Sequence, residues 1–362
     1  MRKTPLRDVH EQLGARFVDF FGWEMPVQYA GILEETRCVR NQVGLFDLCH
    51  MGRIEVTGPD RDAFVDRVFS GRYQTLKEGR AKYGFLLNDE GYPIDDVLVY
   101  REATMVHIVI NATGRDKDLA WIASKKGDLD VTLREVSDDQ AMIALQGPAS
   151  AALLQTLCEA DLSTVRYYSF TRTKVLGTEC LMARTGYTGE DGFELFFDPA
   201  QATTVWNALL EKGAEHGAQP IGLGARDILR LEAGMPLYGN EINLEIDPLE
   251  ADLRFGLDFR KEDGVGLDAL RARKEAGPER IAISLACDGG RVARAGALVC
   301  TPDGTEIGIV TSGGVSPTVG KNIARALVPV AHAEVGTPLA ASIRGRLQPM
   351  TVVPHPFYTR SS

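Results

Sequence analysis

The chain has 362 residues, of which 44% are hydrophobic and 25% are charged, a balance typical of a soluble protein with sizeable cores. Its 40 basic and 50 acidic residues give a formal net charge of −10, which argues against general binding to nucleic acid or to an anionic membrane. The length indicates two or three domains. The N-terminus "MRKTPLRDVHEQLG" lacks the apolar core of a signal peptide, and no stretch approaches the roughly 18 apolar residues of a membrane span, so we expect a cytoplasmic protein.

The residues before about position 274 predict mixed strands and helices. "DLCHMGRIEVTGPDRDAFVDRVFS" indicates a strand, a turn and a helix from about Arg61, and "MVHIVINATGRDKDLAWIASKK" repeats this order. Between them, Leu86–Asn88 and Ile94–Tyr100 form a predicted hairpin. "AMIALQG" is a predicted strand before a helix over 148–157, and "GLGARDILRLEAG" predicts an amphipathic helix.

After about Lys274 the sequence changes to short strands separated by turn signals such as "PDG" and "SGG". This pattern predicts a small all-β domain, a barrel or a sandwich. Ser312 and Ser316, in "TSGGVSPTVG", have no partnered His and Asp at a recognisable spacing, and we interpret them as turn residues. The predicted fold class is α+β with a C-terminal β module.

The six cysteines contain no C-x-x-C pair, and the histidines show no metal-ligand spacing. We therefore expect reduced, buried thiols and no metal site.

Asp95 and Asp96 open the apolar run of the predicted hairpin. Neighbouring strand residues point to opposite faces, so the two carboxylates should meet different surroundings. A buried carboxylate costs several kcal/mol unless a hydrogen bond or a charge compensates it. The strand pattern alone does not choose which of the two has a ligand.

The segment "RTGYTGEDGFELFF" has glycines at 186, 189 and 192 and does not match the dinucleotide-binding fingerprint. The glycines permit either a close backbone approach or a positive φ. Glu194 follows within a predicted apolar strand. Its carboxylate either faces water, as on an ordinary surface strand, or is buried and has a functional role.

Arg226 and Arg230 lie four residues apart on one predicted helix face. They are either solvated or offer a planar guanidinium to a planar polar ligand. Asn111, at the end of a predicted buried strand, either caps the next helix or offers its amide to a heterocycle. Carboxylates, an amide and a guanidinium without a metal suit a heteroaromatic ring such as a pterin, whose N–H and amine edge a carboxylate can accept.

These blocks together resemble the T-protein family of the glycine cleavage system, the tetrahydrofolate-dependent aminomethyltransferases. The matching stretches span nearly the whole chain in the family's order, and the most specific are "IDDVLVY", "INATGRDKDLAWI", "RTGYTGEDGFEL" and "GLGARDILRLEAGMPLYGNEI". The resemblance implies a three-domain cloverleaf around a central folate funnel. The expected domains are 1–52 plus 140–226, 53–139 plus 227–273, and the C-terminal β domain 274–362.

The resemblance also implies the site residues. Asp96 matches the family's catalytic aspartate, and Asp95 is interpreted as structural. The expected folate-binding positions are Glu194 and Arg226 at the pterin edge, with Asn111, Tyr83, Tyr187, Met51 and, in the tail, Tyr358 and Arg360.

The implied reaction moves the one-carbon unit from an aminomethyl group on the lipoyl sulfur of H-protein to tetrahydrofolate, with release of ammonia and without a metal. A folate-dependent demethylase of a small methylated compound is the alternative enzyme, and a folate-binding accessory protein is a third possibility that Asp96 argues against. Two positions depart from the family pattern: Tyr92-Pro93 stiffens the hairpin loop, and Phe255 stands where relatives often carry Trp.

Overall fold

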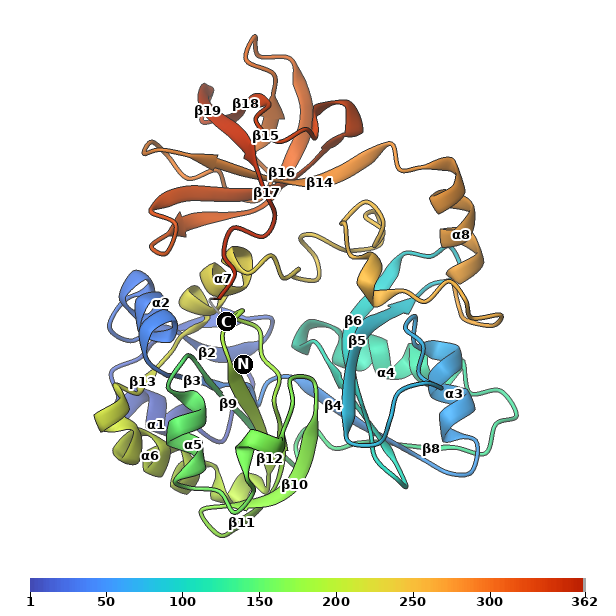
Figure 1. Ribbon diagram of the computed structural model, residues 1–362, viewed down its shortest axis with the longest axis vertical. Helices are drawn as coiled ribbons and strands as arrows, with labels where there is room; N and C mark the ends of the chain where they lie inside the picture. The colour runs from blue at the N-terminus through green and yellow to red at the C-terminus, as the bar shows by residue number, and fades with distance from the viewer. Residues whose placement is uncertain (361–362) are drawn as a thin grey trace. The chain divides into compact units, whose positions relative to one another are not determined.

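The computed structural model, drawn in Figure 1, describes residues 1–360. The chain separates into two compact units. Unit 1 comprises residues 1–66, 73–83 and 97–227, and unit 2 comprises 67–72, 84–96 and the chain from 228 onward. No helix of residues 1–360 is long and apolar enough to cross a membrane. The three domain boundaries expected from the sequence remain a prediction.

Unit 1 contains a six-stranded sheet with helices packed on one face. Its hydrophobic core combines the helices α1, α5 and α6 with alternate positions of the strands, among them Phe193, Leu195 and Phe197. Strand alternation then places Glu194 and Phe196 on the opposite face of the sheet. The strand order is β10 (Phe170–Val175), β11 (Thr178–Ala183), β12 (Gly192–Phe197), β9 (Ala141–Gln146), β3 (Gly44–Asp47), β13 (Gln219–Pro220), and the helices are α1 (Arg7–Gln12), α5 (Ser150–Gln155) and α6 (Ala202–Gly213).

A second sheet has five strands and contains the predicted hairpin. Its order is β5 (Arg80–Leu87), β6 (Pro93–Arg101), β7 (Val106–Ile110), β4 (Gly52–Thr57), β8 (Thr132–Glu135). The two predicted strand–turn–helix segments are confirmed, because α3 (Arg61–Val68) follows β4 and α4 (Arg115–Ser124) follows β7. The remaining N-terminal elements are the β1 (Arg16–Phe20) and β2 (Trp23–Gln28) hairpin and α2 (Ile32–Asn41).

The hairpin loop between β5 and β6 is fixed by its own hydrogen bonds. The backbone N–H of Asn88 donates to Tyr92 at 2.9 Å, and the Asn88 side chain accepts from the backbone N–H of Tyr92 at 2.8 Å. Gly91 has φ +82°, and a Cβ there would lie 2.8 Å from Leu270 of α8 (Leu267–Ala276). Only glycine fits this turn without strain. The guanidinium of Arg273 lies 4.2 Å from the centre of the Tyr92 ring, so the unusual Tyr92 is held by a cation–π contact.

The C-terminal part of unit 2 is a closed six-stranded barrel, which confirms the predicted β domain. Its strands, drawn in orange to red in Figure 1, pair around the barrel in the order β14 (Arg280–Cys287), β17 (Lys321–Pro329), β16 (Glu306–Ser316), β15 (Leu298–Cys300), β18 (Pro338–Ile343), β19 (Arg346–Val353). Inward-facing aliphatic side chains such as Leu285, Val299 and Val352 fill its core. Closure pairs every strand edge, which removes sites for edge-to-edge association.

The interpretation of Ser312 and Ser316 as turn residues is wrong, because both lie in β16. The glycines that suggested a turn instead allow close packing. A Cβ on Gly313 would lie 1.8 Å from the carbonyl oxygen of Ala293, and one on Gly314 would lie 2.3 Å from the Ile228 side chain of α7 (Leu223–Glu232). Both serine hydroxyls bond to residues of α7: Ser312 accepts from Arg230 at 2.6 Å, and Ser316 donates to Glu232 at 2.5 Å.

Within residues 1–360, six short 3-10 helices complete the elements, and the six cysteines all carry free thiols. The 3-10 helices are η1 (Ala112–Gly114), η2 (Leu162–Thr164), η3 (Pro199–Gln201), η4 (Ala214–His216), η5 (Arg254–Gly256) and η6 (Val330–His332).

Candidate functional site

Glu194 is a buried carboxylate on β12, with only 5% of its surface exposed. Every residue of β12 is buried, so this Glu does not face water as an ordinary surface strand residue would. Its carboxylate accepts hydrogen bonds from the hydroxyls of Thr185, at 2.5 Å, and Tyr100, at 3.3 Å. Burial raises the pKa of Glu194, while these hydroxyls and the nearby Arg226 oppose the rise.

The loop that carries Thr185 and Tyr187 is shaped by the glycines noted in the sequence. A Cβ on Gly186 or on Gly192 would lie 1.9 Å or 2.3 Å from the side chain of Gln146. That amide donates to the Thr185 carbonyl at 3.0 Å and accepts from the Thr188 hydroxyl at 2.8 Å. Gly189 has φ +80°. Both expected uses of glycine, close approach and positive φ, therefore occur in this loop.

Arg226 on α7 stacks on an aromatic ring. Its guanidinium carbon lies 4.5 Å from the centre of the Tyr187 ring, and both side chains are partly buried. Burial lowers the pKa of Arg226, and the neighbouring Tyr187 and Glu194 oppose this effect. The structure thus brings together three of the predicted site residues, a carboxylate, a guanidinium and an aromatic ring, within unit 1.

His50 belongs to the same surroundings and was missed by the sequence analysis. It is 2% exposed, packs edge-on against Phe20 with ring centres 5.6 Å apart, and its Nδ1 has no hydrogen-bond partner within residues 1–360. Burial lowers the pKa of His50 to about 3, and the positive charge of Arg226 contributes to the decrease. A single histidine without metal-ligand spacing gives no sequence signal, although His50 directly precedes the predicted Met51.

Three further predicted residues of unit 1 lie in the second sheet or in the turns beside its strands. Asn111 follows β7 at the N-cap position of η1, and its side chain makes no capping hydrogen bond, so the capping interpretation is wrong. Tyr83 lies on β5 and Met51 in the turn before β4. All three are partly buried.

Asp95 and Asp96 lie on β6 with different exposure, as strand alternation predicts. Asp95 is fully buried, with 0% of its surface exposed, whereas Asp96 is partly exposed. Along β6, Asp96 shares its face with Leu98 and Tyr100.

Tyr358 and Arg360 lie in the tail that follows β19. The backbone N–H of Tyr358 donates to the carbonyl of Glu232, the last residue of α7, at 2.8 Å. The adjacent Phe357 packs with Leu231 of α7 and Ile323 of β17. The tail is therefore fixed beside the C-terminal end of α7, with Tyr358 partly buried and Arg360 exposed.

Among residues 1–360, no group of three or more His, Cys, Asp and Glu side chains is arranged to hold a metal ion. The donor set of unit 1 is instead organic: a carboxylate, hydroxyls, an imidazole and a guanidinium beside an aromatic ring. Such a set can recognise a planar ligand through hydrogen bonds to the donor and acceptor groups along its edge.

Residues 6–261 match the family model described as the GCVT N-terminal domain, and residues 280–359 match the glycine cleavage T-protein C-terminal barrel domain. The chain is 46% identical to the aminomethyltransferase of Saccharopolyspora erythraea over 100% of its own length and 99% of that protein. It is 42% identical to the aminomethyltransferase of Desulfitobacterium hafniense, with 99% of each chain covered. The crystal structure of glycine cleavage system aminomethyltransferase T from Bartonella henselae superposes with a TM-score of 0.93 at 32% identity and covers 99% of this chain and 98% of that one.

Proposed function

The chain belongs to the glycine cleavage T-protein family and is an aminomethyltransferase, and from this premise we propose its substrates and the roles of its residues. The acceptor is tetrahydrofolate, and the donor is an aminomethyl group on the lipoyl sulfur of H-protein. The carbon–nitrogen bond to the amine breaks and ammonia leaves. The carbon–sulfur bond also breaks, which releases dihydrolipoyl H-protein, and the carbon is transferred to tetrahydrofolate to give methylenetetrahydrofolate. The observation that supports this proposal is the buried carboxylate of Glu194 close to the guanidinium of Arg226.

Glu194 and Arg226 fit the two kinds of group on a pterin edge. The ring N–H and exocyclic amine are donors, which a carboxylate accepts in bidentate fashion, and the ring carbonyl accepts from a guanidinium. The hydroxyls of Thr185 and Tyr100 orient the Glu194 carboxylate before a ligand arrives. Asn111, Tyr83, Tyr187 and Met51 line the rest of the folate site in this proposal, and Tyr358 and Arg360 contribute from the tail.

Asp96 is the proposed catalytic carboxylate. Tetrahydrofolate supplies the nucleophilic nitrogen N5 when bound. Asp96 orients the folate nitrogens by hydrogen bonding and places a negative charge where positive charge develops as ammonia departs. Such stabilisation is stronger in a site of low dielectric than in water. Asp95, on the buried face of β6, has a structural role.

The assay that tests the function supplies aminomethylated H-protein and tetrahydrofolate to the purified full-length chain. Formation of both ammonia and methylenetetrahydrofolate is expected. A methylated thioether, offered in parallel, is expected to give no product. Turnover of the thioether without turnover of the H-protein donor would instead establish the alternative demethylase.

The variant Asp96→Asn tests whether Asp96 acts in the chemical step or in folate binding. We expect turnover to fall by about 10²- to 10⁴-fold, the usual contribution of a positioned acid or base, while the dissociation constant for folate changes by only a few-fold. Asp89→Asn removes an exposed carboxylate from the loop of the same hairpin and should leave both quantities unchanged. Unchanged turnover in Asp96→Asn would remove Asp96 from the mechanism.

A further inference from the structure

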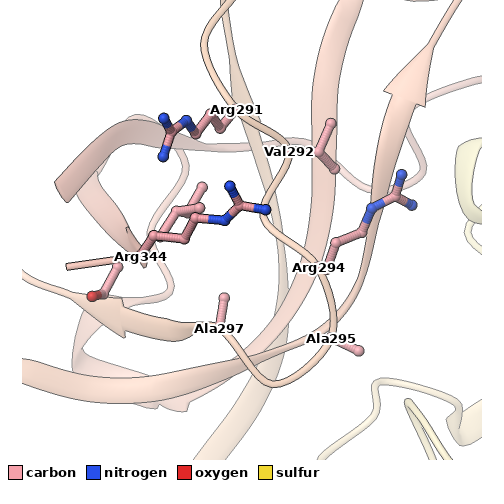
Figure 2. Close-up of a pocket in the computed structure, with 8 residues that line it drawn as sticks. Arg291, Val292, Arg294, Ala295, Ala297 and Arg344 are labelled. Atoms are coloured by element: carbon pink, nitrogen blue, oxygen red, sulfur yellow. The ribbon is translucent and has the colours of Figure 1, made fainter. Parts of the chain in front are cut away.

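The barrel carries a cavity of about 480 Å³ that contains none of the residues assigned to folate. Two segments line it: the loop between β14 and β15, and the end of β18 with the turn that follows it (Figure 2). Its volume is within the range of small-molecule sites. We call it the barrel pocket, and its lining is Arg291, Val292, Arg294, Ala295, Ala297, Ser342, Ile343 and Arg344.

The charge of the barrel pocket is opposite to that of the whole chain. Three of its lining residues are arginines and none is acidic, although the chain has a formal net charge of −10. Within residues 1–360, the guanidinium groups of Arg291 and Arg344 have no carboxylate partner, and both side chains are exposed. Figure 2 shows these two groups on the same side of the loop, with Arg294 turned toward the other side. Unpaired positive charges that share one cavity favour an anion there.

The loop that presents Arg291 is rigidly placed. Arg294 donates to the carbonyl of Gly313 in β16 at 2.9 Å, and the backbone N–H of Gly296 donates to Val310 at 2.8 Å. On the other side, the side-chain amide of Asn322 donates to the Gly289 carbonyl at 2.8 Å. Because the loop is fixed to two neighbouring strands, its backbone loses little freedom when a ligand binds.

Arg344 occupies a backbone position that does not suit an arginine. It is the first residue of a two-residue turn between the paired Ile343 and Arg346, and φ is +51° at Arg344 and +74° at Gly345. Turns of this kind favour Asn-Gly, because a longer side chain is strained at positive φ. The turn therefore carries a less favourable residue where its guanidinium reaches the cavity, and such positions cluster at binding sites.

We propose that the barrel pocket binds a small organic molecule that carries a multivalent oxyanion, either a phosphate ester or a polycarboxylate. Arg291 and Arg344 bind its oxygen atoms through paired N–H donors, while Arg294, turned to the other side of the loop, holds the loop through its hydrogen bond to Gly313. The Ser342 hydroxyl is a further donor, and the apolar walls, Val292 and Ile343 among them, contact the organic part. This inference does not rest on the proposed folate site.

Isothermal titration calorimetry on the full-length chain tests this inference, with pyrophosphate and citrate as separate probes at about 0.1 M salt, where long-range attraction is screened. We expect one saturable site for at least one probe. Arg291→Gln and Arg344→Asn should each weaken the affinity by at least about tenfold. The matched control is Arg346→Gln, which removes the same charge from the same hairpin outside the pocket and should change the affinity by less than about twofold.

Arg344→Asn also separates binding from folding. Asparagine suits the turn, so the thermal midpoint should stay the same or rise while the affinity falls. Binding of pyrophosphate alone identifies a phosphate ester, binding of citrate alone a polycarboxylate, and binding of both the shared oxyanion chemistry. The proposal is overturned if neither probe binds, or if Arg346→Gln weakens binding as much as Arg291→Gln.

Discussion

Glu194 depends on charge for its proposed role, and this can be tested by a change that preserves its size. Glu194→Gln keeps the side-chain volume but replaces one acceptor oxygen with a donor, which would face the N–H edge of a pterin. Because a hydrogen bond to a charged group contributes about 1.5–3 kcal/mol, the dissociation constant for tetrahydrofolate should rise about 10- to 100-fold. Glu179→Gln, an exposed change on β11, is the control. Equal folate affinity in both variants would contradict the proposed contact.

The surroundings of Asp47 predict that the free energy of unfolding depends on pH. It is 5% exposed and accepts hydrogen bonds from the Thr4 hydroxyl at 2.6 Å and the Cys49 N–H at 2.9 Å, with His10 Nε2 also at 2.9 Å. Burial alone would raise the pKa of Asp47, but the interaction with His10 and these hydrogen bonds outweigh it and lower the pKa to about 2. The unfolded chain therefore binds this proton at higher pH than the folded chain does, and the resulting stability is present above about pH 4.

Acid unfolding monitored by circular dichroism measures this contribution. Asp47→Asn should lower the free energy of unfolding by about 2.5 kcal/mol near neutral pH, and the difference from the wild type should shrink as the pH falls from about 4 to 2. Asp8→Asn, at an exposed position of α1, should follow the wild-type curve. A difference that stays constant down to pH 2 would rule out the lowered pKa.

At the scale of elements, the C-terminal end of α7 is fixed by a buried ion pair. Arg230 and Glu241, 1% and 4% exposed, form a contact of 2.6 Å. Ser312 accepts from Arg230, and the Thr311 hydroxyl donates to Glu241 at 2.7 Å. Arg226 lies one turn earlier on the same helix, so this network sets the position of the proposed pterin contact.

Replacing only one partner of the Arg230–Glu241 pair should lower the free energy of unfolding more than replacing both. Arg230→Met leaves the Glu241 charge buried and should cost about 3–5 kcal/mol of unfolding free energy, whereas Arg230→Met with Glu241→Leu should recover much of it. Chemical denaturation measures both variants. Folate affinity should fall in the single variant and recover in part in the double variant. A double variant less stable than the single one would contradict this account.

Elements that follow from local pattern were predicted, and those that depend on long-range packing were not. The strands and helices around Arg61 and Asn111, and the burial difference between Asp95 and Asp96, follow from periodicity. Ser312 was misread because glycines signal turns in a sequence, while here Gly313 makes room for the carbonyl of Ala293, a contact that no local pattern contains. Only the resemblance to a family selected Glu194 and Arg226, because their proximity joins a strand and a helix about 30 residues apart in the sequence.

At the scale of the whole molecule, the barrel shares its compact unit with residues 228–273, which lie before the predicted domain boundary at 274. The barrel hydroxyls of Ser312, Ser316 and Thr318 bond to Arg230 and Glu232, which lie before that boundary. A fragment of residues 274–362 should therefore fold but lose stability relative to residues 228–362, because three buried or partly buried hydroxyls lose their partners. Thermal unfolding of the two fragments measures the difference. Equal midpoints would show that α7 contributes nothing to the barrel.

The length of the β5–β6 hairpin loop determines which of the two aspartates lies on which face of β6. Gly91 and the Asn88–Tyr92 hydrogen bonds fix where β6 begins, and alternation then assigns Asp95 to the buried face and Asp96 to the open one. Deleting one residue from this loop and shifting β6 by one position would exchange the two acids without changing either of them. The gene would still encode both aspartates, yet Asp95 instead of the proposed catalytic Asp96 would lie on the partly exposed face. In this proposal the spacing of the loop therefore matters as much as the carboxylate itself.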